Sequence, residues 1–395
     1  MDAYVGGCVN QLESRIRELR ARIPRRLPRD YDTLAKECRS RLDTSLATLR
    51  LLRSDPAYQL PANQPERMRK LKREVSELDM LEAEGIAALV RATEDDHQLN
   101  RLLERITQEI DYPLVTPVVT TLSQQYFCIN TDLNLLAVPL IEGRFLLHLP
   151  DLYHELAHPL LLARDEPQVE ALLGAFGLAL RDVLTYLDDE TVKESRRNGP
   201  IANATDLDLW RLCWVRFWLT EFFCDLFAVC TLGPAFAWSH FHLSAMRGRD
   251  PFEVPESYPS SHPADDARMR AMLAALSASG FNAEAATIQS QWASMLDASG
   301  FRAEPEYHRC FPASLLNALA SHAKVGVEGM QCRLAMKGSL DGAVRLALNG
   351  AWTRFWTDPS IYAQWEGDAV RELMSEDSDA TTVTASGHAA GSNRS

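Results

Sequence analysis

The residues best placed for chemistry are two histidines and a glutamate in the segment YHELAH, which ends at His158. Positions four apart share one face of a helix, so His154 and His158 can bind one metal ion. Glu155 stands beside them and can accept a proton from a water molecule on that ion. Zinc suits such a site, because catalytic zinc uses three protein ligands and keeps one position open. The alternative is an amphipathic helix whose histidines are surface or satisfied core residues.

A second pair of reactive side chains, Glu221 and Asp225, lies in an apolar segment rich in aromatic residues. These carboxylates are also four residues apart and would share a helix face. Burying them is costly unless they are paired or bind a metal. We therefore predict that Glu221 is the third zinc ligand and that Asp225 holds a ligand histidine by its second ring nitrogen. Pairing with Arg211, Arg216 or another buried cation is the alternative.

A third element is the segment SHPADDAR, in which His262 and Arg268 form an H-P-x4-R pattern at the start of a predicted helix. Alone, the pattern is easily met by chance. Its position after the other two motifs makes it informative.

The three motifs in this order resemble the prenyl-protease and membrane stress-protease family of gluzincin zinc metallopeptidases, over roughly residues 126–270. The resemblance implies a β-hairpin or edge strand before a two-helix zinc site, and a zinc-dependent endopeptidase with one zinc ion per chain. Carried over by position, it implies zinc ligation by His154, His158 and Glu221, base catalysis by Glu155, a supporting role for Asp225, and a cleft lined by His262 and Arg268.

The tetrahedral oxyanion of such a reaction needs a donor besides the metal, and His262 and Arg268 are the candidates, followed by Tyr258. His262 has two other possible roles, as a fourth zinc ligand or as a loop residue that caps the following helix. We expect an extended substrate to pair with an edge strand drawn from residues 133–149. Pro159 should kink or end the active-site helix.

The elements that position these residues follow from hydrophobic periodicity, which predicts a predominantly helical α+β fold. A small β-hairpin or sheet of two or three short strands is expected within residues 126–149, and a helix begins at Pro150-Asp151. Further helical patterns cover residues 8–53, 65–110, 166–188, 206–232, 263–279 and most of 282–375, and polar loops cover 189–205 and 247–262.

These patterns divide the chain of 395 residues into four parts. We predict a helical N-terminal segment over 1–111 with a regulatory or partner-binding role, and a metallopeptidase core over 112–280. A helical region over 281–375 and a disordered tail over 376–395 follow.

Charge is unevenly distributed along the chain, whose net charge is −13. Residues 1–73 contain 17 Lys and Arg against 9 Asp and Glu, so the other 322 residues carry −21. This balance makes general nucleic-acid binding unlikely. Eight scattered cysteines, no signal-peptide pattern and no apolar run of membrane-spanning length predict a cytoplasmic protein without a membrane span.

The leading hypothesis is thus a cytoplasmic zinc-dependent endopeptidase that cleaves soluble protein or peptide substrates. Its helical regions, or a regulatory protein bound to the N-terminal segment, would gate it. The alternative is a non-catalytic regulatory or binding protein that zinc stabilises. A nucleic-acid-associated factor that uses the basic segment 1–73 is a weaker third possibility.

Overall fold

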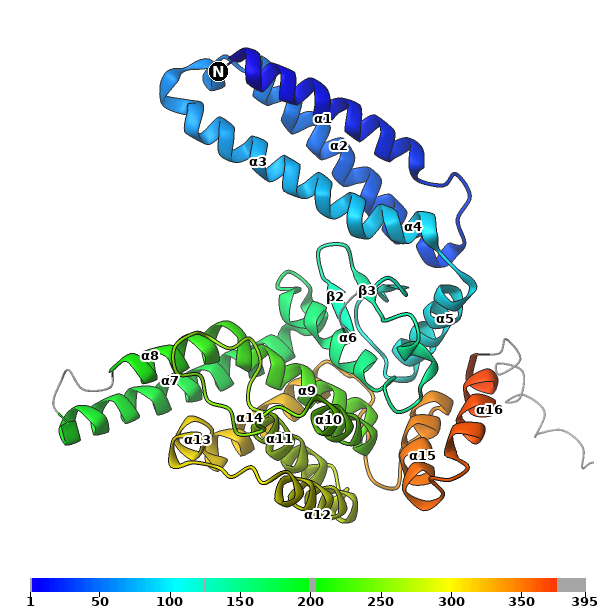
Figure 1. Ribbon diagram of the computed structural model, residues 1–395, viewed down its shortest axis with the longest axis vertical. Helices are drawn as coiled ribbons and strands as arrows, with labels where there is room; N and C mark the ends of the chain where they lie inside the picture. The colour runs from blue at the N-terminus through cyan, green and yellow to red at the C-terminus, as the bar shows by residue number, and fades with distance from the viewer. Residues whose placement is uncertain (1, 124–125, 199–203, 375–395) are drawn as a thin grey trace, which may run out of the picture.

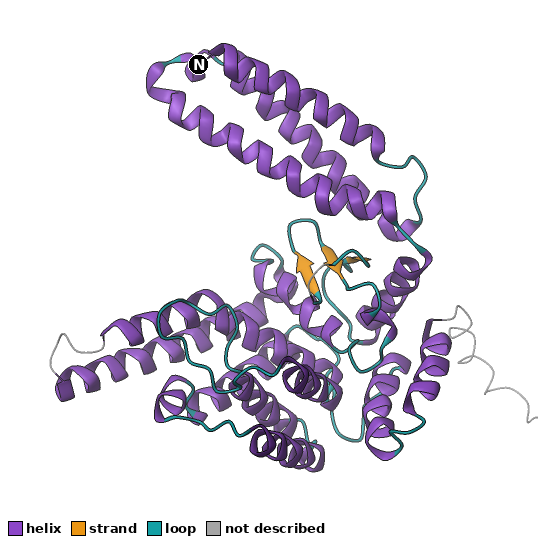
Figure 2. Ribbon diagram, viewed as in Figure 1, coloured by secondary structure: helices purple, strands orange, loops and turns teal. Residues whose placement is uncertain are grey.

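The computed structural model describes residues 2–123, 126–198 and 204–374. Most of these residues are helical, and one small three-stranded sheet lies between the N-terminal helices and the remaining ones (Figures 1 and 2). This confirms the predicted fold class. Among the described residues, no helix has both the length and the apolar character needed to cross a membrane. The predicted disordered tail, 376–395, lies outside the described residues.

The N-terminal helices form an arm that projects from the rest of the molecule (Figure 1). It consists of α1 (Asp2–Arg22), α2 (Asp32–Ser54), α3 (Gln64–Met80), a π-helical turn (Leu81–Ile86) and α4 (Ala87–Arg91). The predicted helical stretch 8–53 is therefore interrupted between α1 and α2. Pro24 and Pro28 lie in that interruption, and proline removes a backbone donor that a continuous helix requires.

The arm has a hydrophobic core of its own, built from leucines such as Leu42, Leu49 and Leu78 that are fully buried. The same cluster includes Val118, Leu133 and Leu135, which lie in or next to the small sheet. The arm is therefore packed onto the sheet through apolar contacts.

The sheet consists of β1 (Val118–Thr120), β2 (Cys128–Asn130) and β3 (Leu135–Ala137) in the order β1-β3-β2. β3 pairs parallel with β1 and antiparallel with β2. The expectation that residues 133–149 supply an edge strand is wrong, because β3 has a neighbour on each side. Residues 142–144 form a 3-10 turn rather than a turn between strands, and the edge strand that contacts the following helix is β2.

The remaining helices surround one large hydrophobic core that runs from Leu99 to Leu373. In chain order they are α5 (Glu94–Glu109), α6 (Asp151–Leu162), α7 (Glu170–Asn198), α8 (Ala204–Cys213), a π-helical turn (Trp214–Trp218), α9 (Leu219–Leu232), α10 (Pro234–Arg247), α11 (Asp265–Ala278), α12 (Asn282–Ser299), α13 (Pro305–Cys310), α14 (Ala313–Gly329), α15 (Ala343–Thr357) and α16 (Tyr362–Met374). The core does not divide at residue 280, and α5 belongs to it rather than to the arm.

Two local predictions need correction. A loop was expected over 189–205, but residues 189–198 are helical, because α7 continues to Asn198, and α8 begins at Ala204. Pro159 does not end its helix, since α6 continues to Leu162. The proline lacks the N–H that would bond to the Glu155 carbonyl, but the last turn closes through a bond from the Ala163 N–H to the Pro159 carbonyl.

Candidate metal centre

Two helices that pack against each other, α6 and α9, bring the first two motifs together. Asp151 stands in the first turn of α6, where an acidic residue favours the helix start, and Leu152, Leu156 and Leu160 are fully buried. Twelve of the fourteen residues of α9 are buried, so the helix lies in the middle of the core. Asp225 is among these buried residues, whereas Glu221 is one of the two that are not and lines a cleft.

Asp225 lies where the sequence predicts it. Its Oδ1 is 2.9 Å from Nδ1 of His154, and its side chain is fully buried. A carboxylate at Nδ1 favours the tautomer with the proton on that nitrogen, so Nε2 of His154 is left with a lone pair. His154 is thereby oriented to bind a cation through Nε2.

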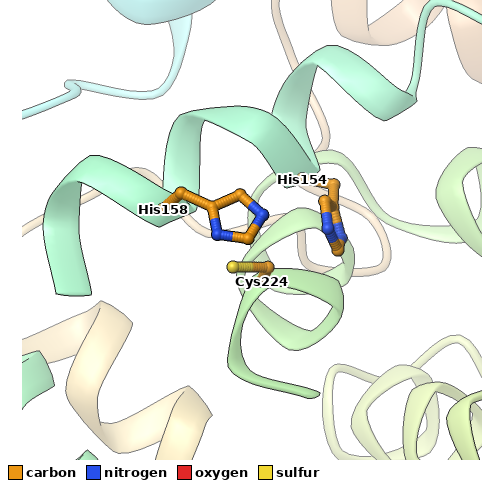
Figure 3. Close-up of side chains that lie close together, drawn as sticks. All are labelled: His154, His158 and Cys224. Carbon is orange, nitrogen blue, oxygen red and sulfur yellow. The ribbon is translucent and has the colours of Figure 1, made fainter. Parts of the chain in front are cut away.

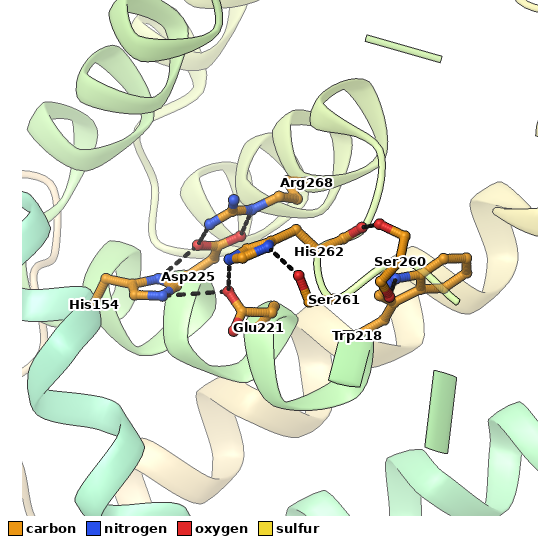
Figure 4. A network of polar contacts seen from close by, with 8 residues as sticks. All are labelled: His154, Trp218, Glu221, Asp225, Ser260, Ser261, His262 and Arg268. Carbon is orange, nitrogen blue, oxygen red and sulfur yellow. Dashed lines mark hydrogen bonds and ion pairs between the residues drawn. The ribbon is translucent and has the colours of Figure 1, made fainter. Parts of the chain in front are cut away.

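Arg268 acts on the same carboxylate from α11. Its Nε donates to Asp225 Oδ2 at 2.7 Å and its Nη2 donates to Oδ1 at 2.6 Å (Figure 4). Burial raises the pKa of Asp225, but the Arg268 charge and hydrogen bonds outweigh burial and hold the pKa well below its usual range. Arg268 lines the cleft, and its two hydrogen bonds to Asp225 make it a positioning residue; its role as an oxyanion donor stays a prediction.

Glu221 faces the free nitrogen of His154. Its Oε2 lies 3.5 Å from His154 Nε2, beyond the usual hydrogen-bond length of about 3.2 Å. Two ligand atoms on one tetrahedral zinc ion, each about 2.0–2.1 Å from it, are about 3.4 Å apart. The gap between the two side chains therefore suits a shared cation.

The electrostatics of this pair also favour a positive charge between them. Burial lowers the pKa of His154, but the hydrogen bond to Asp225 and the negative charges of Asp225 and Glu221 outweigh it and raise the pKa to about 10. Burial raises the pKa of Glu221, yet His154 more than compensates and lowers it to about 2. A proton on His154 and a metal ion are thus alternative cations at this position.

Cys224 is the residue that sequence reasoning missed. Its Sγ and one ring nitrogen each of His154 and His158 all lie within 4.8 Å of one another, and it projects from α9 toward the two imidazoles of α6 (Figure 3). Among the described residues, Glu221 is not part of this compact group. Imidazole, thiolate and carboxylate are the ligands that zinc accepts in proteins, so the donor set fits such an ion. Only a prediction of which α9 residue faces α6 could have signalled Cys224.

Glu155 lies next to these donors and is 8% exposed. Burial raises its pKa to about 7, although His154 and a hydrogen bond from the Ile129 backbone act in the opposite direction. Ile129 belongs to β2, so the edge strand touches the carboxylate of the H-E-x-x-H motif.

By contrast, burial lowers the pKa of His158 to about 4, which keeps that imidazole neutral and able to bind a metal.

His262 reaches the same cluster from the loop before α11. Its Nε2 lies 3.7 Å from Glu221 Oε2, and its Nδ1 is 2.9 Å from the Ser261 hydroxyl. The side chain is 60% exposed and lines the cleft. The helix-capping role is wrong, because α11 begins at Asp265 and has no side-chain cap.

A cleft of about 540 Å³ gives access to the cluster. His154, Glu155, Glu221, His262 and Arg268 all line it. The sequence did not identify two further lining residues, Tyr126 and Asp151, which share a hydrogen bond. Tyr258, by contrast, is 84% exposed and does not line the cleft.

Comparisons of this chain with models of protein families, with curated proteins and with solved structures find no match.

Proposed function

We propose that the chain is a zinc-dependent endopeptidase whose active site is the cleft between α6, α9 and the loop before α11. The observation that carries this proposal is that residues from all three sequence motifs line the same cleft. His154 is oriented by Asp225, Glu221 faces its free nitrogen at 3.5 Å, and Glu155 lines the same cleft. The resemblance of the motif order to gluzincin peptidases points to the same chemistry.

The proposed zinc ligands are His154, His158 and Glu221, one ion per chain. When bound, zinc would supply Lewis-acid polarisation of the scissile carbonyl and of the attacking water. Asp225 keeps Nδ1 of His154 occupied so that Nε2 points into the site, and Arg268 neutralises Asp225. Asp225 and Arg268 together hold the imidazole of His154 in one orientation.

Glu155 is the proposed general base. Its carboxylate, with a pKa of about 7, can take a proton from the attacking water near neutral pH and release it to the leaving amine. The Ile129 backbone bond keeps this carboxylate beside β2. His262, which is exposed to the cleft next to Glu221, is the proposed donor to the developing oxyanion.

The proposed substrate is a protein segment in extended conformation. β2 is an edge strand of the sheet and contacts α6, so a peptide that pairs with it would pass the Glu155 carboxylate. The arm packs on the same sheet through Leu133 and Leu135, which makes it the natural place for a regulatory partner to act. A cytoplasmic location agrees with the eight cysteines, all of which are free thiols.

A second candidate function is that of a regulatory or binding protein that a zinc ion stabilises without catalysis. The compact His154, His158 and Cys224 group favours it, because structural zinc sites are closed and commonly use cysteine. In that case the carboxylate of Glu155 has no chemical task.

The test combines metal analysis with cleavage of a broad peptide library by the full-length chain. Wild type and Glu155→Gln should each hold one zinc, and only wild type should cleave. His154→Ala should lose both metal and cleavage. Glu166→Gln, on the exposed end of the loop after α6, is the matched control and should behave as wild type. Equal metal content and no cleavage from any variant would favour the regulatory protein. Absence of zinc from the wild-type chain after reconstitution would exclude both functions.

A further inference from the structure

The thiol of Cys224 occupies a place that neither the motifs nor the proposed mechanism uses. It lies on α9 one residue before Asp225 and is fully buried. Figure 3 shows it opposite the two imidazoles of α6, and the three donor atoms lie within 4.8 Å of one another. A thiol there is next to metal-binding nitrogens instead of an apolar wall.

The number of available donors exceeds what a catalytic zinc ion needs. His154 and His158 of α6 form a compact group with Cys224 of α9, whereas Glu221 of α9 lies outside that group, with its Oε2 3.5 Å from His154 Nε2. Four protein ligands complete a tetrahedral zinc site, whereas a catalytic site has three and keeps one position for water. If Glu221 moves in to bind together with these three donors, water has no place on the ion.

We propose that Cys224 is a fourth ligand that closes the metal site in a resting state, together with His154, His158 and Glu221. This inference rests on the proposed metal-dependent function and adds to it a built-in restraint. On ligation the S–H bond breaks, sulfur donates an electron pair to the metal, and the proton passes to solvent. Release of the thiolate, with uptake of one proton, restores the position for water.

Glu221 and Cys224 differ in their neighbours and in the kind of donor atom that they offer. Glu221 lies near two histidines, His154 at 3.5 Å and His262 at 3.7 Å. Thiolate is the softer donor, and zinc binds both kinds. Glu221 and Cys224 lie within one turn of α9, so the proposed restraint needs no movement of the arm.

The test uses the full-length chain with Co²⁺ in place of zinc and records its near-ultraviolet absorption. A cobalt–thiolate bond gives an intense charge-transfer band that histidine and carboxylate ligands do not give. The wild-type chain should show this band, and Cys224→Ser and Cys224→Ala should lose it while still holding one metal ion. Cys230→Ser is the matched control, because Cys230 is a buried cysteine on the same helix but outside the donor group. It should keep the band.

Cleavage by the zinc-loaded forms tests the resting state. Cys224→Ala leaves three ligands and should cleave the peptide library several times faster than wild type. A cobalt-loaded wild type without the band, with cleavage by the zinc form intact, would overturn the role of Cys224 and leave the proposed function standing. A band with equal cleavage by wild type and Cys224→Ala would overturn the restraint. Failure of the wild type to bind Co²⁺ or zinc would overturn both proposals. If the Cys224 variants do not fold, a wild-type spectrum without the band overturns ligation, and a band that survives replacement of each of the other seven cysteines by serine supports it.

Discussion

The cleft and the N-terminal arm both contain arginine–carboxylate pairs, but in opposite surroundings. In the cleft, the side chains of Arg268 and Asp225 are 9% and 0% exposed and approach to 2.6 Å. In the arm, Arg15 and Asp79 are 29% and 61% exposed and approach to 2.7 Å. The two contacts have similar lengths but differ in how far their side chains are exposed to solvent.

This difference separates the tasks of the two regions. A buried ion pair rarely adds net stability, because desolvation offsets the attraction, so its presence calls for another reason. In the cleft the reason is His154, which the paired Asp225 orients. The Arg15 pairs of the arm connect α1 to α3 and to the π-helical turn at the surface, and the buried leucines of the arm supply stability.

The largest expected effect comes from leaving the buried carboxylate without its arginine. Arg268→Met should lower the free energy of unfolding by about 3–5 kcal/mol, because the buried charge of Asp225 loses its main counter-charge. Urea denaturation followed by circular dichroism measures the loss. The double variant with Asp225→Asn should recover part of it. A loss as small as that of an exposed pair would contradict the distinction between cleft and arm.

The next effect concerns metal binding. Asp225→Asn should weaken zinc binding by about 10–100-fold, because an amide orients His154 less firmly and no longer raises its basicity. Competition with a chelator measures the affinity of the folded variant. Asp265→Asn is the control, since Asp265 lines the same cleft without a bond to His154, and its affinity should match wild type. Equal affinities for both variants would show that Asp225 serves packing alone.

The residues that sequence reasoning placed well are those whose relation lies within one helix. The period of 3.6 puts His154 with His158, and Glu221 with Asp225, on common faces. One contact between helices was also predicted, because the cost of burying Asp225 calls for a partner, and the structure has its contact with His154 at 2.9 Å.

Relations between elements were harder to predict. Arg268 lines the cleft as expected, but the sequence did not predict its hydrogen bonds to a carboxylate 43 positions away. Cys224 was missed for the same reason, since its metal-binding neighbours belong to another helix. β3 was taken as an edge strand because strand order depends on pairing with the distant β1, which a local pattern does not encode.

A smaller effect depends on pH. Burial lowers the pKa of His240, in the cleft wall, below its ordinary 6.5, although Asp265 and Asp225 act in the opposite direction. The unfolded chain therefore takes up this proton first as the pH falls. The native state loses stability from about pH 6.5 down to the folded-state pKa, at up to about 1.4 kcal/mol per pH unit. Above about pH 6.5 His240 does not contribute to the dependence of the unfolding free energy on pH.

His240→Gln should remove that part of the slope, which urea midpoints at a series of pH values would detect. The glutamine amide can still donate to the Asp265 carbonyl that His240 Nε2 contacts at 2.9 Å. Identical slopes for variant and wild type would mean that His240 protonates equally easily in both states. The cleft would then be wetter than its burial indicates.

The smallest effect belongs to the arm. Arg15 contacts Asp79 at 2.7 Å and Glu82 at 2.6 Å, and both carboxylates are more than half exposed. Water screens such contacts, so Arg15→Gln should cost about 0.2–1 kcal/mol of unfolding free energy. About 1 M salt should remove most of that cost, because the Debye length is then about 3 Å. Arg268→Met should keep its larger cost at the same salt. If salt reduced the loss of unfolding free energy equally in both variants, burial would not explain the difference between the ion pairs of the cleft and the arm. The orienting role of Asp225 would then need another physical basis.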